Sequence, residues 1–312
     1  MAGMEQLPYD EFGLFHENAS EHGLPYDGPP IVRREAVHLP DGRTISALIW
    51  GDTTPDVVLV HGGAQNAHTW DTTIMALRRS AVAIDLAGHG HSGWRDDGAY
   101  SPQSLADDVA VVIAALAPQA HLVVGMSLGG LTAMELAARH PHLVRALMMV
   151  DITPGVNRAK TKAVVDFVNG PQSFPSFEAL LARTIEHNPT RTESSLRRGI
   201  LHNARQEADG SWVWRYDRGS HARTLDDDAN GDGQGDGDAG GVSPLWDDFA
   251  SIGCSLSLVR GMLSPVVDDD DVAEARRRQP ALRVHEVEGA GHSVQGDRPL
   301  ELAALINTTI GQ

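Results

Sequence analysis

A serine between two glycines, where an apolar run gives way to a helix-like pattern, constrains this chain most. Residues 125–129 read Gly-Met-Ser-Leu-Gly; they end the apolar run 121–125 and precede a helical pattern over 128–139. Glycines two residues to either side of Ser127 let a strand and a helix approach closely across a sharp turn. Such a turn exposes the serine hydroxyl to the N–H groups that begin the helix. The pattern predicts a nucleophilic serine, although a glycine-rich strand-to-helix connection would have the same spacing.

Strand-like and helix-like segments alternate around this turn. The hydrophobic pattern predicts strands at 57–61, 81–85, 121–125, 144–151, 256–261 and 282–287, and helices at 66–79, 102–117, 128–139, 270–279 and 297–310. The middle strands are continuously apolar, which is typical of parallel strands that helices cover on both faces. Two β-rich runs, 31–39 and 43–50, surround Pro40-Asp41-Gly42 and predict a hairpin. The fold class is therefore α/β, with a mostly parallel central sheet.

Two stretches depart from this alternation. Residues 1–30 contain several prolines and glycines, so we expect an irregular N-terminal segment. Residues 153–249 interrupt the strand pattern, with helices expected over 155–205 and an extended segment over 210–216. We expect the rings of Trp212 and Trp214 in that extended segment to point opposite ways. The core then comprises residues 31–152 and 250–312.

The insertion contains an Asp- and Gly-rich stretch, 226–241, which predicts a flexible acidic loop. Asp226, Asp228, Asn230 and Gly231 match the opening of a calcium-binding loop. The twelfth position of that loop is Gly237, where a glutamate should complete the calcium ligands. Calcium binding is therefore the weaker of the two hypotheses.

Composition narrows the classes of partner. The chain has 25 Lys and Arg against 42 Asp and Glu, a formal charge of −17, which disfavours nucleic acid and anionic membranes as partners. The single cysteine, Cys254, cannot form an internal disulfide, and residues 1–30 lack the basic flank and apolar centre of a signal peptide. We expect a cytoplasmic protein that acts on a small molecule without a metal or cofactor. A homodimer is compatible with the sequence.

Three further motifs follow predicted strands. They are His-Gly-Gly at 61–63, Asp-Leu-Ala-Gly-His-Gly-His-Ser-Gly at 85–93 and Gly-Ala-Gly-His-Ser at 289–293. Together with the Ser127 motif, and in this order, they resemble the α/β-hydrolase fold family over roughly residues 31–310, apart from the insertion. The resemblance implies a serine hydrolase in which the insertion is a helical lid over the substrate pocket.

The resemblance also implies roles for particular residues. His292 would be the general base that activates Ser127, and the backbone N–H groups of Gly63 and Leu128 would stabilise the oxyanion. Histidines 61, 89 and 91 lie in motifs that resemble structural parts of the family, so we interpret them as structural.

The acid of the triad departs from the family's common pattern. The family most often carries it just after the strand that here ends at Gly261, but Ser264 or Pro265 occupies that position. Asp151 ends an earlier strand, where some branches such as haloalkane dehalogenases carry the acid. Asp268, the first of four consecutive aspartates, is the alternative, although acidic residues there could simply cap a helix. We favour Asp151, because a buried carboxylate at a strand end suits the orienting role.

A serine nucleophile favours acyl transfer to water. The leading hypothesis is hydrolysis of a small to medium, largely apolar carboxylester, thioester or lactone through an acyl-enzyme. An alternative is hydrolysis of carbon–carbon bonds in meta-cleavage-type products. Those substrates carry carboxylates, so one of arginines 183, 191, 197, 198 and 260 should then lie in the pocket. A non-catalytic small-molecule binder with the same fold is the third hypothesis.

Overall fold

The computed structural model describes residues 9–218 and 243–311. The Asp- and Gly-rich segment 226–241, with its candidate calcium ligands, lies outside the described residues. Among the helices that are described, none combines the length and the hydropathy that crossing a bilayer requires.

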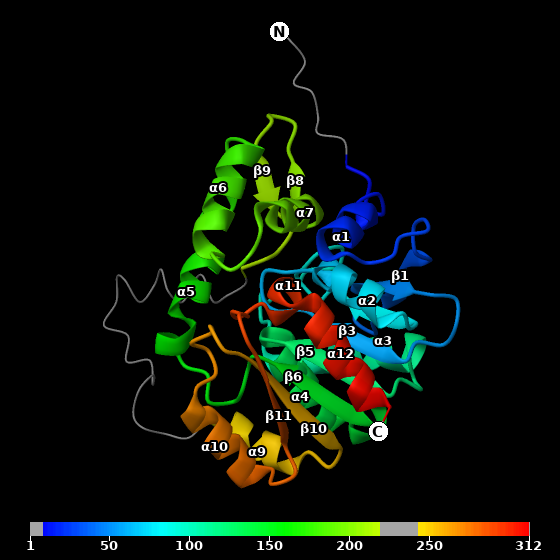
Figure 1. Cartoon of the computed structure of the whole chain (residues 1–312), viewed down its shortest axis with the longest axis vertical. Helices are drawn as coiled ribbons and strands as arrows, with labels where there is room; N and C mark the ends of the chain where they lie inside the picture. The colour runs from blue at the N-terminus through cyan, green and yellow to red at the C-terminus, as the bar shows by residue number, and fades with distance from the viewer. Residues whose placement is uncertain (1–8, 219–242, 312) are drawn as a thin grey trace.

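An eight-stranded sheet lies at the centre of the molecule (Figure 1). Its strands, in spatial order, are β1 (Val32–His38), β2 (Thr44–Trp50), β4 (Ala81–Ile84), β3 (Val57–Val60), β5 (Leu122–Met126), β6 (Ala146–Val150), β10 (Ser255–Gly261) and β11 (Arg283–Val287). The expected hairpin is β1–β2, which joins β4 in antiparallel orientation, and all other neighbours are parallel. The predicted α/β class with a mostly parallel sheet is confirmed.

Helices cover both faces of the sheet. On one face lie α1 (Phe15–His22), α2 (Asp71–Leu77), α11 (Val294–Asp297) and α12 (Pro299–Ile310), and on the other α3 (Pro102–Leu116), α4 (Leu128–Arg139), α9 (Leu245–Ser251) and α10 (Asp269–Arg278). Short 3₁₀ turns, η1 (Ala67–Trp70) and η2 (Pro141–Leu143), precede α2 and follow α4. Alternate residues of β3 enter opposite cores, Val58 and Val60 one and Val57 and Leu59 the other. This explains why the strands read as continuously apolar.

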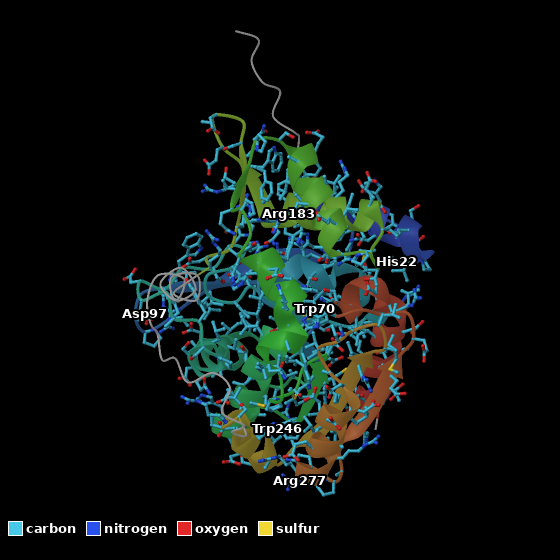
Figure 2. The ribbon with its side chains drawn as sticks, turned by 90° about the vertical axis from the view of Figure 1, so that its left-hand side faces the viewer. His22, Trp70, Asp97, Arg183, Trp246 and Arg277 are labelled. Carbon is cyan, nitrogen blue, oxygen red and sulfur yellow. The ribbon has the colours of Figure 1, made fainter. Side chains whose placement is uncertain are left out.

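Each of the two cores contains a large buried tryptophan. Figure 2 places Trp70, which is fully buried, near the centre of the molecule. Trp246 lies nearer the end away from the insertion, where it contacts Phe249 edge-on.

The expected irregular N-terminal segment is wrong for residues 15–22, which form helix α1. Phe15 and Ala19 lie one turn apart and are both buried, with the ring of Phe15 packed edge-on against Trp50. Gly23 ends the helix in the left-handed conformation, with φ of 64°. The prolines and glycines correctly indicate where this segment turns. The stretch between Gly13 and Gly23 contains no such residue, however, and it is long enough for two helical turns.

The insertion between β6 and β10 forms a separate layer (Figure 1). Its described elements are α5 (Arg158–Val168), β7 (Ser173–Phe174), α6 (Phe177–His187), α7 (Glu193–Asn203), β8 (Ala204–Gln206) and β9 (Trp212–Trp214), with the three strands paired in the order β7-β9-β8. A hydrogen bond of 2.7 Å from the N–H of Asp217 to the carbonyl of Gly88 ties it to the core.

Trp212 and Trp214 lie on the same face of β9, so the expectation of opposite directions is wrong. Side chains two residues apart in a strand share a face. Both rings are buried in the insertion's own apolar cluster, where Trp212 packs against Phe177 and Trp214 against Phe174.

Candidate active site

Ser127 lies at a strained turn between β5 and α4. Its φ of 52° and ψ of −121° are unusual for a residue with a side chain. A Cβ atom on Gly125 would lie 2.2 Å from the carbonyl oxygen of Gly129, and one on Gly129 would lie 2.3 Å from that of His61. Both positions therefore require glycine, and the spacing that the sequence shows is a packing requirement of this turn.

His292 meets Ser127 from the loop between β11 and α11. Its Nε2 lies 3.0 Å from the Ser127 Oγ, and its Nδ1 lies 2.8 Å from the Asp151 Oδ2. Since a carboxylate oxygen only accepts, Nδ1 carries the proton and Nε2 is free to accept the serine hydroxyl. The structure thus brings Ser127, His292 and Asp151 into one hydrogen-bonded line from three separate loops.

Asp151 is completely buried where β6 ends. Its Oδ1 accepts the N–H of Gly261 at 2.9 Å, and its Oδ2 accepts the hydroxyl of Ser264 at 2.5 Å as well as the imidazole of His292. Its φ of 51° adds a second strained residue to the site. Ser264, which stands near the position where a family acid was expected, instead donates to the acid that comes from the neighbouring strand.

The alternative acid, Asp268, lies elsewhere. It is the N-cap of α10, where its side chain accepts the N–H of Asp271 at 3.0 Å, and it pairs with Lys160 at 2.8 Å. The proposal of Asp268 as the partner of His292 is therefore wrong, because the side chain serves the start of a helix, as acidic residues there commonly do.

Replacing Asp268 separates these two roles experimentally. Asp268→Ala should lower the free energy of unfolding by about 1 kcal/mol through the lost cap. Ester hydrolysis should stay within about twofold of the parent, because Lys160 keeps its contact with Asp271 at 2.6 Å. Urea unfolding and initial rates measure the two quantities, and a large loss of rate with unchanged stability would contradict this assignment.

The two expected oxyanion donors flank Ser127. Leu128 begins α4 directly after the serine, so its N–H belongs to the first, unpaired turn of the helix. The loop that holds Gly63 passes close by, since a Cβ on Gly62 would lie 3.2 Å from the Cβ of Ser127. A Cβ on Gly63 would lie 3.9 Å from the Cδ2 of Leu128, so these two residues lie next to each other beside the serine.

His61 and His89 hold the surrounding loops. Complete burial lowers the pKa of His61 to about 3, so this ring stays neutral. Its Nδ1 donates to the carbonyl of Gly62 at 2.7 Å and its Nε2 accepts the N–H of Leu86 at 3.0 Å. His89 likewise donates to the carbonyl of Ala87 and accepts the N–H of Ala64. The partly exposed His91 donates its backbone N–H to Asp85.

Ser127 and His292 open into a cavity of about 280 Å³ beneath the insertion. The apolar part of its lining includes Ala64, Met126, Ala163, Val164, Phe167, Val168, Pro189, Leu263, Pro265 and Val266. Lys160, Asn188 and Arg191 are among its polar lining residues. Of the five arginines considered from the sequence, Arg191 is the one that borders this cavity; Arg198 pairs with Glu21 and Arg260 with Asp269.

The fold and the geometry of this site are typical of the α/β hydrolases. The sequence profile of the alpha/beta hydrolase family matches residues 57–305, and the chain belongs to that family. The enzyme class that the sequence predicts, a hydrolase that acts on ester bonds, is supported by its relatives.

Among those relatives is the esterase Rv0045c of Mycobacterium tuberculosis, 45% identical over 304 residues that cover 95% of this chain and 94% of the relative. A solved structure of that esterase, from work on its inhibition by transition metals, has a TM-score of 0.81 at 44% identity and covers 97% of this chain and 99% of its own. The 2-(acetamidomethylene)succinate hydrolase of Mesorhizobium japonicum is 28% identical, with coverage of 81% of this chain and 87% of the relative.

Proposed function

We propose that the protein is a serine hydrolase in which Ser127, His292 and Asp151 act as nucleophile, general base and orienting acid. The serine–imidazole contact of 3.0 Å carries this proposal. In the reaction, Nε2 of His292 accepts the Ser127 proton as Oγ attacks the substrate carbonyl, and it then donates that proton to the leaving alcohol. Water hydrolyses the acyl-enzyme by the same proton transfers in reverse order. Asp151 holds the imidazole and stabilises its cationic form.

The developing negative charge on the carbonyl oxygen needs donors that are already in place. We assign this role to the N–H groups of Gly63 and Leu128, which border Ser127. The Leu128 donor lies at the N-terminus of α4, where the helix dipole also favours an anion.

The substrate class follows from the cavity. A volume of about 280 Å³ with a mainly apolar wall of Val164, Phe167 and Leu263 suits a short to medium acyl group. We propose a carboxylester, thioester or lactone of this size as substrate, with α5 of the insertion acting as the lid over it. We place this activity in the cytoplasm, in keeping with a single cysteine, Cys254.

One observation favours the carbon–carbon hydrolase as a second candidate. Arg191 lines the cavity, its side chain donates to Ser195 at 2.5 Å, and no carboxylate among the described residues lies within ion-pair distance. Its Nε has no hydrogen-bond partner among the described residues. A guanidinium in this state could hold a substrate carboxylate. The charge of the half-buried Asp297 raises the pKa of Arg191, while burial lowers it more.

A substrate panel distinguishes the two candidates. Aryl esters of increasing acyl length, a neutral thioester and a vinylogous diketone with a carboxylate should be compared by kcat/KM. The ester proposal predicts turnover of the short esters and none of the diketone. Preferred turnover of the diketone, lost in Arg191→Met, would replace it by the carbon–carbon hydrolase.

The hydroxyl of Ser264 gives a test of how the acid is held. Ser264→Ala removes one of the donors to Asp151, and a hydrogen bond to a charged group is worth about 1.5–3 kcal/mol. We expect kcat to fall roughly tenfold or more with little change in KM, because the change acts on the orientation of His292 rather than on substrate binding. Ser264→Thr, which keeps the hydroxyl, is the matched control and should retain most of the rate.

A further inference from the structure

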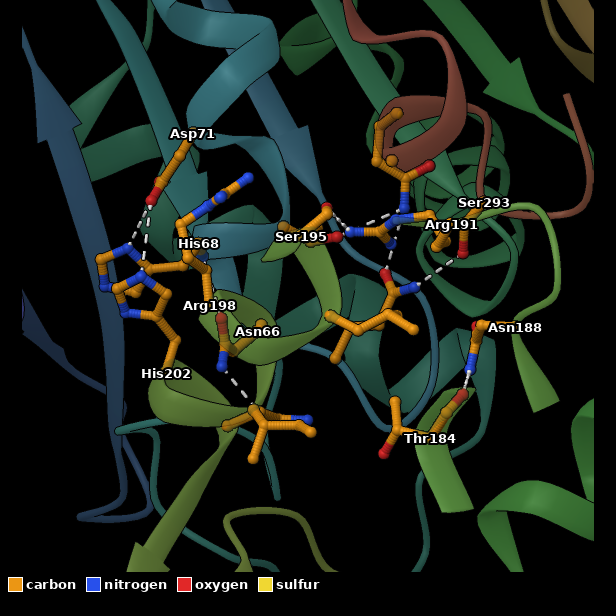
Figure 3. A pocket seen from close by; sticks show the side chains of 18 of the residues that line it. Asn66, His68, Asp71, Thr184, Asn188, Arg191, Ser195, Arg198, His202 and Ser293 are labelled. Carbon is orange, nitrogen blue, oxygen red and sulfur yellow. Dashed lines mark hydrogen bonds and ion pairs between the residues drawn. The ribbon is translucent and has the colours of Figure 1, made fainter. Parts of the chain in front are cut away.

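A second cavity, of about 150 Å³, lies beside the active-site cavity, under α7 (Figure 3). Its lining includes a buried group of potential metal ligands, His68, Asp71 and His202, which we call the His–Asp–His cluster. His68 lies in η1 and Asp71 begins α2, both in the core, whereas His202 comes from α7 in the insertion. The reaction proposed for Ser127 makes no use of these three side chains.

The ligand atoms of the cluster converge. Nδ1 of His68 lies 2.9 Å from the Asp71 Oδ2, and Nε2 of His202 lies 3.9 Å from the same oxygen. One ligand atom from each residue lies within 4.8 Å of the other two. Figure 3 shows both imidazoles presenting an edge to Asp71. Two imidazole nitrogens and a carboxylate oxygen are a ligand set typical of zinc and similar divalent metals.

The outer nitrogens of the two imidazoles already have partners. Nε2 of His68 lies 3.1 Å from the Glu11 carboxylate, and Nδ1 of His202 lies 2.8 Å from the Tyr9 hydroxyl. Metal-binding histidines usually donate their second N–H to a carboxylate or another oxygen, which fixes the tautomer and the direction of the lone pair. Glu11 and Tyr9 would keep the outer N–H of each ring in place. A metal would then take Nε2 of His202 and, by displacing the proton that Nδ1 of His68 now donates to Asp71, Nδ1 of His68 as well.

A buried oxygen without a partner points to a missing ligand. Oδ1 of Asp71 has no hydrogen-bond partner among the described residues, although the side chain is almost completely buried. Leaving a buried carboxylate oxygen unpaired is unfavourable, and a bound cation would remove that cost. The guanidinium of Arg34 approaches His68 only at the far nitrogen, Nε2, and is already engaged by Asp85.

We propose that His68, Asp71 and His202 bind one divalent transition metal of the zinc class. The fourth coordination position would face the cavity and take a water molecule. The two imidazoles now stack, with ring centroids 3.8 Å apart and planes 10° from parallel. Since an imidazole binds a metal in the plane of its ring, metal binding would open the stacked rings into a wedge. The bound metal would tie α7 to the core next to the active-site cavity.

Cobalt binding to the full-length protein tests this proposal, because Co²⁺ in a nitrogen- and oxygen-ligated site of low coordination number absorbs visible light. Metal-free protein should bind one Co²⁺ per chain with that absorption, and Zn²⁺ should displace it and raise the melting temperature. Asp71→Asn and His202→Phe should each weaken binding at least about tenfold; the phenyl ring keeps the stacking on His68 but offers no ligand.

The chain has 15 histidines, and those outside the cluster could also bind Co²⁺. A variant of a surface histidine is therefore the matched control. His38 is exposed and lies in β1, outside the cluster, so His38→Gln should bind Co²⁺ as the parent does. Ester hydrolysis by each variant shows that it has folded. Absence of the one-to-one Co²⁺ complex in the parent, or its persistence in both cluster variants, would overturn the proposal, and neither result bears on Ser127.

Discussion

Ser127→Ala should abolish ester hydrolysis, with kcat/KM reduced by at least about 10⁴-fold. The variant lacks the nucleophile that forms the acyl-enzyme, and substrate binding together with the oxyanion donors accounts for a small residual rate. Rates with a short aryl ester at high enzyme concentration measure the loss. The variant is expressed and purified in a separate preparation, so that another esterase does not contribute to the measured rate.

Stability should change little in this variant. Alanine at φ of 52° carries nearly the same backbone strain as serine, and the Ser127 side chain makes its described hydrogen bond to His292 alone. A melting temperature close to that of the parent would show that the lost rate reflects chemistry. Retention of more than about a tenth of the parent rate by the folded variant would remove Ser127 as nucleophile.

Asp151→Asn should lower kcat by about 10⁴-fold, the second large effect. Both oxygens of Asp151 accept hydrogen bonds, Oδ1 from Gly261 and Oδ2 from Ser264 and His292. An asparagine must place its NH₂ at one of these positions. Toward His292 the NH₂ favours the tautomer with the proton on Nε2, which cannot accept the Ser127 proton. Toward Gly261 the NH₂ faces the backbone N–H, so that one donor opposes another.

Moving the acid to the neighbouring strand gives a stringent control. Ser264 lies beside the Asp151 Oδ2, at the position where the family more often has its acid. The double variant Asp151→Asn, Ser264→Asp should therefore have a kcat at least about tenfold higher than that of Asp151→Asn, without a matching change in KM. If Asp151→Asn hydrolyses esters at nearly the parent rate, Asp151 has no orienting role.

Most of the fold could be predicted because local patterns determine it. A continuously apolar run such as 57–60 indicates a strand that is buried on both faces. The glycines around Ser127 indicate that a strand and a helix approach each other so closely that any other residue would clash. The predicted strands and helices of the core agree with the structure within a few residues. Helix α1 was missed because its stability comes from the contact of Phe15 with Trp50, which is distant in sequence.

The acid illustrates what a sequence leaves open. Asp151 and Asp268 both follow strand-like runs, and only the sheet order, which places β6 beside β10, decides which carboxylate reaches His292. The His–Asp–His cluster lay beyond prediction for the same reason. His68 and Asp71 are neighbours in the chain, but His202 joins them only because α7 packs on the core. The cavity lining depends in the same way on how α5 lies over the sheet.

Covalent labelling by a fluorophosphonate tests the central claim most directly, because this reagent reports a serine activated by a neighbouring base. The parent protein should take up one phosphonate per chain, on the peptide that contains Ser127, and lose ester hydrolysis in proportion to labelling. His292→Gln, which keeps the serine but removes the base, should label at least about a hundredfold more slowly. Full inactivation with the label on another residue, or an active enzyme that takes up no label, would contradict the account.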